Sequence, residues 1–206
     1  MSNTVDTNPV LVSTTADMKT TRTYTMTTRA EAAEATRRRI QDAAITLAGE
    51  RPFAEITLDA IADRARVSVK TLLRQFGSRD GLLAAAMDVA MAATESERRT
   101  VPGDAAAAVH VVVDHYETRG RTALLMLAQE DHDDFARTAT SRGKAMHRSW
   151  VREAFSPATD DEALLDLLVV ATDVYAWKLL RLDRGHSRAL TETRMHDLVR
   201  ALLPQE

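Results

Sequence analysis

The chain contains no cysteine, and only 4% of its 206 residues are aromatic. The lack of cysteine excludes disulfide bonds and thiolate metal sites. The seven glycines and five prolines form no glycine-rich loop of the kind that cradles phosphates. No apolar run approaches the ~20 residues needed to span a bilayer, and no charged-then-apolar leader opens the chain. We therefore expect a cytoplasmic protein that needs no cofactor and does not enter a membrane.

The pattern that is present is helical, and strand-like alternation is missing. Residues 1–28 hold ten threonines and no apolar periodicity, which predicts a disordered tail. Thr28 and Glu31 then fit a capping box, so we expect a first helix from about Arg29 to Ala48. The fold class expected for the whole chain is all-α.

Two short helices separated by a tight turn are predicted over residues 57–76. Thr57 and Ser68 are both good N-cap residues, and apolar residues follow each of them at helical spacing. Gly77 is expected to end the second helix, and Ser78 to begin a third. Two helices at this spacing are typical of a helix-turn-helix, whose second helix lies in the DNA major groove.

The charge of the chain supports this interpretation. Residues 64–79 contain five Lys or Arg residues and no Asp or Glu, although the net charge of the chain is −3. Residues 29–80 contain ten Lys or Arg and eight Asp or Glu residues. Residues 81–206 contain fifteen Lys or Arg and twenty Asp or Glu residues. Basic charge confined to one segment is the footprint of a phosphate-binding surface. Charge alone would fit an ordinary solvated helix pair equally well, and the two caps favour DNA binding.

The first turn of a helix in the major groove faces base edges, so we expect Val69, Lys70 and Thr71 to read bases. For Lys70 a phosphate contact is the alternative. One turn later, Arg74 and Gln75 are placed to contact phosphates and set the register.

Further phosphate contacts are expected on the flanking helices. Arg79 begins the next helix, whose N-terminal dipole also favours a phosphate. Arg37 and Arg38, in the first helix, are either phosphate ligands or part of a solvated surface.

The stretch ITLDAIADRARVSVKTLLRQFGSRDGLL, together with the preceding ATRRRIQDAAITLAGERPF, resembles the DNA-binding domain of the TetR (tetracycline repressor) family of transcriptional regulators. The resemblance covers roughly residues 34–95. It implies a dimer that places one recognition helix in each of two successive major grooves of a near-palindromic operator. It also implies DNA contacts by Ser68–Thr71, and phosphate contacts at Thr57, Leu73, Gln75 and Arg79.

Three residues depart from the pattern of that family. Arg66 stands where glycine is usual, so it either adopts another turn geometry or accepts a strained left-handed conformation and adds a phosphate contact. Leu73 stands where tyrosine is typical, which removes one hydroxyl-to-phosphate bond. Gln75 replaces a frequent histidine and keeps a donor without its pH dependence.

The rest of the chain predicts a helical regulatory and dimerisation domain over residues 81–206, following a DNA-binding domain over residues 29–80. The expected helices beyond the third span residues 105–118, 121–130, about 133–155, 162–183 and 188–203.

The helix predicted over 162–183 is apolar around most of its circumference and must therefore be buried on all sides. We expect one face to meet the core and another to meet a second subunit, with the last helix adding to the interface. The alternative is a single large monomeric core. The residues expected in the dimer interface are Leu164, Leu168, Tyr175, Leu179, Leu198 and Leu202.

A small-molecule effector of unknown identity is implied by the resemblance, and pockets in helical bundles lie between the helices. The residues that could line such a pocket are Tyr116, Met126, Glu130, Trp150 and Tyr175, although each is also compatible with plain core. An open apolar cavity among residues 105–180 would favour a repressor released by a ligand. A solid core would favour a DNA-binding dimer controlled by a protein partner.

A metal-dependent hydrolase is a much weaker alternative. His110 and His115 are five residues apart, which does not place both on one helix face, and no third ligand is evident. The acidic run at residues 130–134 falls at an expected helix junction, where such residues cap and solvate. We expect neither a metal site nor an enzyme.

Overall fold

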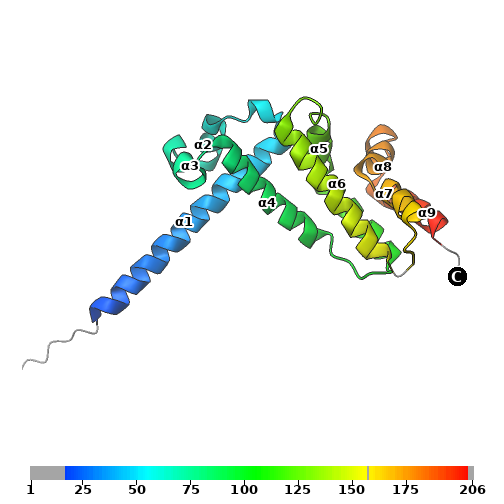
Figure 1. The fold of residues 1–206 in the computed structure, drawn as a ribbon, viewed down its shortest axis with the longest axis horizontal. Coiled ribbons are helices and arrows are strands. Elements are labelled where there is room, and N and C mark those ends of the chain that lie inside the picture. Colours follow the sequence, from blue (N-terminus) through cyan, green and yellow to red (C-terminus); the bar gives the residue numbers. More distant parts are fainter. Residues whose placement is uncertain (1–16, 157, 204–206) are drawn as a thin grey trace, which may run out of the picture. The chain divides into compact units, whose positions relative to one another are not determined.

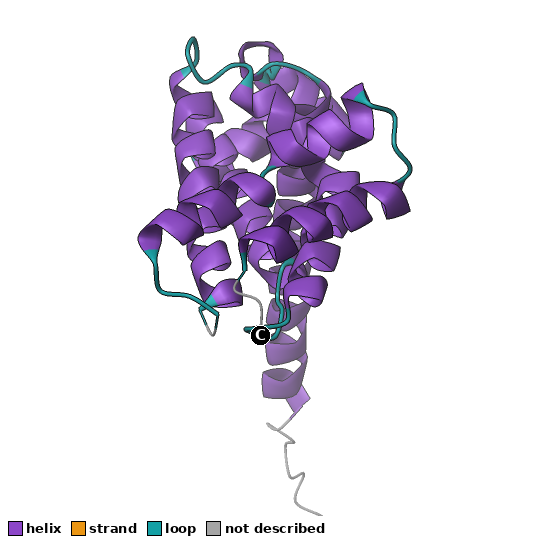
Figure 2. Ribbon diagram, turned by 90° about the vertical axis from the view of Figure 1, so that its right-hand side faces the viewer, coloured by secondary structure: helices purple, strands orange, loops and turns teal. Residues whose placement is uncertain are grey.

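The computed structural model describes residues 17–156 and 158–203, with only the backbone described for residues 17–28. These residues form helices and loops without a β-strand, as Figure 2 shows by colour. The predicted all-α fold class is confirmed. The chain divides into two compact units, Met1–Arg39 and Ile40–Glu206.

The helices follow one another along the chain with short connections. The N-terminal elements are α1 (Asp17–Glu50), the 3-10 turn η1 (Phe53–Glu55), α2 (Leu58–Ala65), α3 (Val69–Phe76) and α4 (Arg79–Glu97). The later elements are α5 (Ala105–Leu127), α6 (Asp134–Phe155), α7 (Glu162–Ala171), α8 (Val174–Lys178), the π-helix η2 (Leu179–Asp183) and α9 (Arg188–Leu202).

The first helix begins at Asp17, so the prediction of a disordered tail up to residue 28 is wrong from that residue onward. The predicted capping box at Thr28 does not start the helix. Once a helix is nucleated, each added residue gains a backbone hydrogen bond, and threonine costs no more than about 0.7 kcal/mol relative to alanine. The part of the predicted tail before Asp17 lies outside the described residues.

Two buried apolar clusters organise the second unit. One joins the last turns of α1 to α2, α3 and α4, and includes Ile40, Leu47, Ile61, Leu72 and Leu82. Each of these five side chains is at most 2% exposed. This cluster fixes the orientation of the two short helices predicted from the caps, whose bounds agree with the structure.

The other cluster lies among α5, α6, α7, α8 and α9. The helix α5 packs against α6, α8 and α9 and is central to it, and Figure 1 shows α5 and α6 side by side. The prediction of separate helices over 105–118 and 121–130 is wrong, because α5 continues through Gly120. A Cβ at Gly120 would lie 2.6 Å from Cζ3 of Trp177, so the absence of a side chain here permits close packing.

The single helix predicted over 162–183 is also wrong, because the chain breaks at Thr172 and Asp173. The hydroxyl of Thr172 donates to the carbonyl of Leu168 over 2.7 Å, and the Asp173 side chain accepts from the amide of Tyr175 over 2.8 Å. Such local bonds compete with the helical ladder. The apolar periodicity continues across the break and therefore conceals it.

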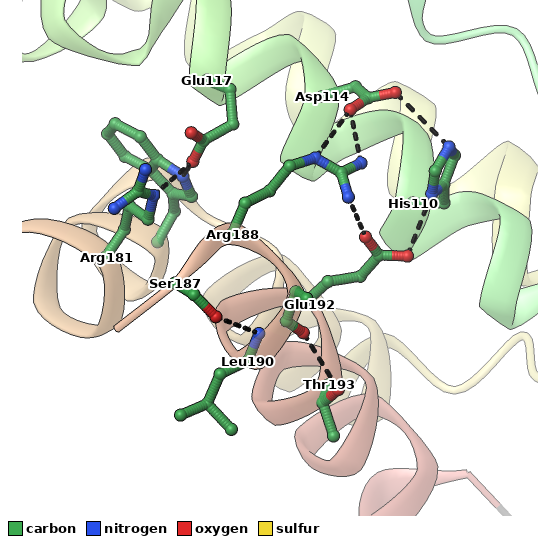
Figure 3. A network of polar contacts seen from close by, with 11 residues as sticks. His110, Asp114, Glu117, Arg181, Ser187, Arg188, Leu190, Glu192 and Thr193 are labelled. Carbon is green, nitrogen blue, oxygen red and sulfur yellow. Dashed lines mark hydrogen bonds and ion pairs between the residues drawn. The ribbon is translucent and has the colours of Figure 1, made fainter. Parts of the chain in front are cut away.

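A network of ion pairs joins α9 to α5 on the outside of this cluster (Figure 3). The Arg188 guanidinium bonds to Asp114 over 3.0 Å and to Glu192 over 2.7 Å. The other oxygen of Glu192 lies 2.9 Å from Nδ1 of His110. Isolated exposed pairs contribute about 0.2–1 kcal/mol each, and a network of several fixes the orientation of the helix more firmly.

The domain boundary expected at residue 80 stays a prediction. The contacts of the chain divide it at Arg39 instead. The helix α4 explains why the contacts do not divide the chain at residue 80. Its first turns pack in the first cluster, and Arg98, just after its end, contacts Tyr116 and Trp150 of the second cluster.

Candidate nucleic-acid interface and buried cavity

The start of α2 is fixed by Thr57. Its hydroxyl oxygen accepts a hydrogen bond from the amide of Ala60 over 3.1 Å, as the predicted N-cap requires. Ser68 does the same for α3 by accepting from the amide of Thr71 over 3.2 Å. Ser78 caps α4 through the amide of Gly81 over 3.0 Å. The three caps predicted from the sequence are therefore confirmed.

The turn between α2 and α3 passes through Arg66 in the left-handed region, with φ 55° and ψ 50°. The amide of Arg66 donates to the carbonyl of Asp63 over 3.2 Å, and the amide of Val67 donates to that of Ala62 over 3.0 Å. This pair of bonds is a Schellman motif, in which glycine normally occupies the left-handed position. Of the two geometries left open by the sequence, Arg66 adopts the strained one, and its side chain is exposed.

The outward face of α3 carries Lys70, Leu73 and Arg74, all exposed at the spacing of one helical turn. Leu72 points the other way and is 1% exposed. The exposure of Leu73, at 42%, was not anticipated by the sequence, which indicated only a lost hydroxyl contact.

The predicted base-reading set divides between this face and the core side of the helix. Val69 is half-buried and packs against the first apolar cluster. Thr71 is half-buried, with its hydroxyl 3.0 Å from that of Ser68. Lys70 is the member that is exposed to solvent.

Arg79, which the sequence predicts to contact a phosphate, is bonded to groups of its own chain. Its Nε donates to the carbonyl of Ile56 over 2.7 Å, and one terminal nitrogen donates to the carbonyl of Phe53. The other bonds to Asp80 over 3.1 Å. The guanidinium therefore holds the η1 turn in place, and this use of the side chain argues against the predicted phosphate contact.

The remaining phosphate candidates differ in exposure. Arg74 is exposed, whereas Gln75 is half-buried on the same helix. Arg37 and Arg38 belong to the Met1–Arg39 unit, in which Arg38 is exposed and Arg37 is half-exposed and has a partner. Their contacts with DNA stay a prediction.

Residues 40–86 match the family model described as "Bacterial regulatory proteins, tetR family". This segment contains both short helices and the strained turn between them. This segment belongs to the tetR family of bacterial regulatory proteins. Its DNA-binding function follows from that membership, and the helix-turn-helix supplies it.

Solved structures agree with this regulator in fold. A transcriptional regulator from Rhodococcus sp. Rha1 matches with a TM-score of 0.63 at 16% identity, over 81% of this chain and 95% of that chain. A TetR transcription regulator from Haloarcula marismortui matches with a TM-score of 0.57 at 17% identity, over 83% and 100%. The multidrug binding protein EbrR, complexed with imidazole, matches with a TM-score of 0.56 at 20% identity, over 82% and 90%. No curated protein gives a match to this chain.

A cavity of about 520 Å³ lies within the Ile40–Glu206 unit of the regulator. Its walls come from the end of α1, from η1, from one face of α4, from α5 and α6, and from residues 173–175. The apolar wall includes Leu83, Met87, Met91, Met126 and Phe135. Pockets for small molecules fall in this range of volumes and are lined in this way.

Three of the five residues predicted to line a pocket do so, namely Tyr116, Met126 and Tyr175. The prediction is wrong for Glu130, which is not part of the cavity wall and forms an ion pair with Lys144 over 2.7 Å. It is also wrong for Trp150, whose ring lies in the second apolar cluster and whose Nε1 donates to the carbonyl of Arg98 over 2.8 Å. Glu130 lies in the turn between α5 and α6, because the helix predicted to extend to residue 130 ends at Leu127, and helical periodicity does not show which face of α6 Trp150 occupies.

One end of the cavity is polar. Arg98, His115, His147 and Asp173 line it beside Tyr116. Burial, assisted by the nearby Arg98 charge, lowers the pKa of both His115 and His147 to about 4. Burial raises the pKa of Asp173, and it raises that of Tyr116 to about 12. Near pH 7 both histidines are therefore neutral. No local sequence pattern points to Arg98 or His147, because these residues come from different helices.

The predicted dimer residues separate into buried and exposed groups. Leu168 is fully buried in the second cluster, and Leu164 and Leu202 pack partly against it, so the prediction fails for Leu168. The exposed members are Tyr175, Leu179 and Leu198. The exposed apolar surface also includes Leu167 and Val170, which are not among the residues predicted for the interface. Residues 162–183 thus have one face in the core and one exposed apolar face, and the contact of that exposed face with a second subunit stays a prediction.

The histidines weighed as metal ligands have separate partners. His110 contacts Asp114 and Glu192, whereas His115 lies 3.0 Å from the carboxylate of Glu97. Among the described residues there is no group of three His, Asp or Glu side chains arranged to hold a metal ion. Likewise, none of the described helices is long and apolar enough to cross a membrane.

Proposed function

We propose that this regulator is a repressor that binds a near-palindromic operator as a homodimer and leaves it when a small molecule fills the cavity. The observation that carries the proposal is the cavity of about 520 Å³ between the helices. An open apolar cavity of this kind is the feature that distinguishes control by a ligand from control by a protein partner. In the same fold, EbrR is described as a multidrug binding protein.

A route from the cavity to DNA supports release by a ligand. Phe53 of η1 lines the cavity and packs edge-on against Phe135 of α6, with ring centroids 4.9 Å apart. Its amide donates to the side chain of Gln129 over 2.8 Å, and its carbonyl accepts from Arg79. Thr57, the cap of α2, is four residues further along the chain. A ligand that displaces Phe53 therefore acts on the segment that begins the helix-turn-helix.

The helix α4 supplies a second connection. It lines the cavity along one face, through Leu83, Met87, Met91 and Thr94, and it begins immediately after α3. A tilt of α4 on ligand binding would move the recognition helices of a dimer relative to each other. For the switch to operate, the ligand must bind the tilted state more tightly than the DNA-bound state.

For DNA recognition we propose Lys70 as the residue that reads bases, with Thr57, Arg66, Ser68 and Arg74 at phosphates. Lys70 and Arg74 are exposed on one face of α3, and neither has an ion-pair partner in the part of the chain that the structure describes. A lysine can donate to O6 and N7 of guanine in the major groove. Leu73 lies between them on the same face and suits a thymine methyl group.

Selection of bound sequences from a random duplex pool, followed by footprinting, tests the proposal. We expect two inverted half-sites about 10 base pairs apart and loss of protection when an effector is added. The absence of any enriched palindrome would contradict the operator model. Enrichment without release by any small molecule would instead favour control by a protein partner.

The variant Lys70→Ala separates base reading from phosphate binding. If Lys70 reads a base, discrimination at one position of each half-site falls by about 1–3 kcal/mol while binding to random DNA is retained. A uniform loss over all sequences, with a lower salt dependence, would identify a phosphate contact. Arg99→Ala, an exposed cation beyond the far end of α4, is the matched control and should leave binding unchanged.

A further inference from the structure

Arg98 is a buried arginine at the polar end of the cavity, and 5% of it is exposed. It occupies the C-cap of α4, where its amide donates to the carbonyl of Thr94 over 3.0 Å. Its own carbonyl accepts from the indole nitrogen of Trp150 over 2.8 Å. The backbone on both sides of this residue is therefore fixed, and the guanidinium is held against the cavity wall.

The guanidinium of Arg98 has neutral neighbours. One terminal nitrogen donates to Nδ1 of His147 over 3.1 Å. The cation lies 5.1 Å from the ring centroid of Tyr116 and 5.7 Å from that of Trp150. Within the described part of the chain no carboxylate comes within ion-pairing distance of it, and its buried Nε has no hydrogen-bond acceptor.

His147 does not supply a counter-charge. Its Nδ1 accepts from Arg98, and its Nε2 lies 3.3 Å from the carbonyl oxygen of Val169, so the proton is on Nε2 and the ring is neutral. The low pKa of this histidine agrees with that assignment. His115 is neutral as well, and it faces Glu97.

The other cations and one anion of the cavity wall are satisfied by partners in the chain. Arg119 pairs with Glu97 over 2.6 Å, and Lys144 pairs with Glu130 over 2.7 Å. Glu50 pairs with Arg64 over 2.6 Å. These pairs leave Arg98 and Asp173 as the wall charges without a salt bridge among the described residues.

Asp173 does not neutralise Arg98 by direct contact. Its Oδ1 accepts from the amide of Tyr175 over 2.8 Å and thereby caps α8. The pKa of Asp173 is raised chiefly by burial, and the charge of Arg98 opposes that rise. A buried charge without a contacting counter-ion is costly, and an anion placed against it removes part of that cost.

We propose that the effector is an organic carboxylate whose anionic group pairs with Arg98 and whose apolar body lies along the methionine-rich wall. This inference rests on the proposed function, because it assigns the chemical class of the effector in that same cavity. A planar guanidinium binds carboxylate oxygens in a defined geometry. Met87, Met91 and Met126 are adaptable apolar side chains that suit a flexible or aromatic body.

A panel of aliphatic and aromatic carboxylates, each with its primary amide and its amine, tests the assignment on the unaltered protein. Decanoate, decanamide and decylamine form one such triplet. Thermal shift and calorimetric titration measure binding, and release from a fluorescent operator duplex is measured in parallel. We expect carboxylates to bind at least tenfold more tightly than the matched amides and amines. Binding confined to neutral or cationic members, or no binding by any carboxylate, would overturn the assignment.

The variant Arg98→Gln should weaken carboxylate binding at least tenfold, and Arg98→Lys should retain part of it. Arg99→Gln, the exposed neighbouring arginine, is the matched control and should bind carboxylates normally. Operator binding by each variant without ligand verifies that it is folded. An Arg98→Gln protein that binds the operator and still binds carboxylates at full affinity would refute the role of Arg98.

Failure of this inference and failure of the proposed function give different results. If carboxylates bind at Arg98 but DNA affinity does not change, the anion site stands and release by a ligand is wrong. If a neutral compound releases the operator and no carboxylate binds, release stands and the anion site is wrong.

Discussion

Arg66 lowers the stability of the fold through its left-handed conformation, but it places an exposed positive charge beside the start of α3. An L-residue in the left-handed region loses about 1–2 kcal/mol relative to a helical conformation, and glycine does not pay this penalty. The Schellman motif at the end of α2 requires that conformation, since the Ala62 and Asp63 carbonyls accept from the turn. An exposed guanidinium beside the start of α3 offers a reason for keeping the arginine.

Replacing this residue separates the two effects. We expect Arg66→Gly to raise the free energy of unfolding by about 1 kcal/mol, because the strain is relieved. We expect it also to weaken operator binding and to reduce the salt dependence by roughly one phosphate contact per subunit. Urea unfolding and binding titrations at several salt concentrations measure both quantities.

The variant Arg66→Ala is the control for that experiment. It removes the charge but keeps a Cβ, so it should lose affinity without gaining stability. Unchanged affinity in both variants would show that Arg66 does not contact DNA.

Arg79 shows where residue-level reasoning from sequence stops. Its place in the first turn of α4 and the cap at Ser78 both follow from the local sequence. The direction of its side chain depends on Ile56 and Phe53, which approach it from a different part of the chain. No local sequence pattern predicts the contact of Arg79 with these two carbonyls.

At the scale of elements, Gly120 decides how closely α5 packs. Glycine inside a helix costs about 1 kcal/mol relative to alanine, so the sequence favoured a break near this residue. The helix continues because Trp177 occupies the space that a side chain would need. The indole then donates to Glu117 over 3.0 Å, which fixes it across α5.

We expect Gly120→Ala to lower the free energy of unfolding by about 1–3 kcal/mol, because the added Cβ would lie 2.6 Å from the Trp177 ring. Gly143→Ala is a matched control within α6, since nothing in the described residues lies within 4 Å of the new Cβ. It should raise stability by about 0.5–1 kcal/mol. Urea unfolding of both variants measures the difference, and equal effects would contradict the packing argument.

The break between α7 and α8 has a comparable origin. Thr172 and Asp173 divert backbone groups to side chains, and they also bring Asp173 and Tyr175 to the wall of the cavity. A continuous helix would keep the apolar periodicity that the sequence shows. The side chains of Thr172 and Asp173 compete locally with the backbone for hydrogen bonds. Whether the helix breaks there also depends on the burial of Thr172, which is complete.

At the scale of the whole molecule, the exposed apolar residues of α7, α8 and α9 support the proposed dimer. Val170 is 67% exposed and Leu167 is 52% exposed, and both lie on α7, which packs beside α9. Apolar side chains of this size gathered on neighbouring helices mark a protein interface more often than a solvated surface. The proposed operator also requires two recognition helices per complex.

We expect sedimentation equilibrium to give about twice the 22.7 kDa subunit mass. Val170→Asp should raise the dissociation constant of the dimer about 100-fold or more, because an unpaired carboxylate would be buried in the interface. Val101→Asp is the control, since Val101 is exposed on the loop after α4. A monomeric wild-type protein, or equal effects of the two variants, would exclude this surface as the interface.

The sequence by itself determined the short-range features of this protein. Thr57, Ser68 and Ser78 cap helices because each needs only an amide three residues away, and the family resemblance depends on the same local pattern. The tertiary structure decided the direction of Arg79, the close packing at Gly120, and the meeting of Arg98 with His147 across 49 residues of chain. Such features depend on contacts between distant segments, and helical periodicity specifies a buried face without specifying which neighbour will cover it.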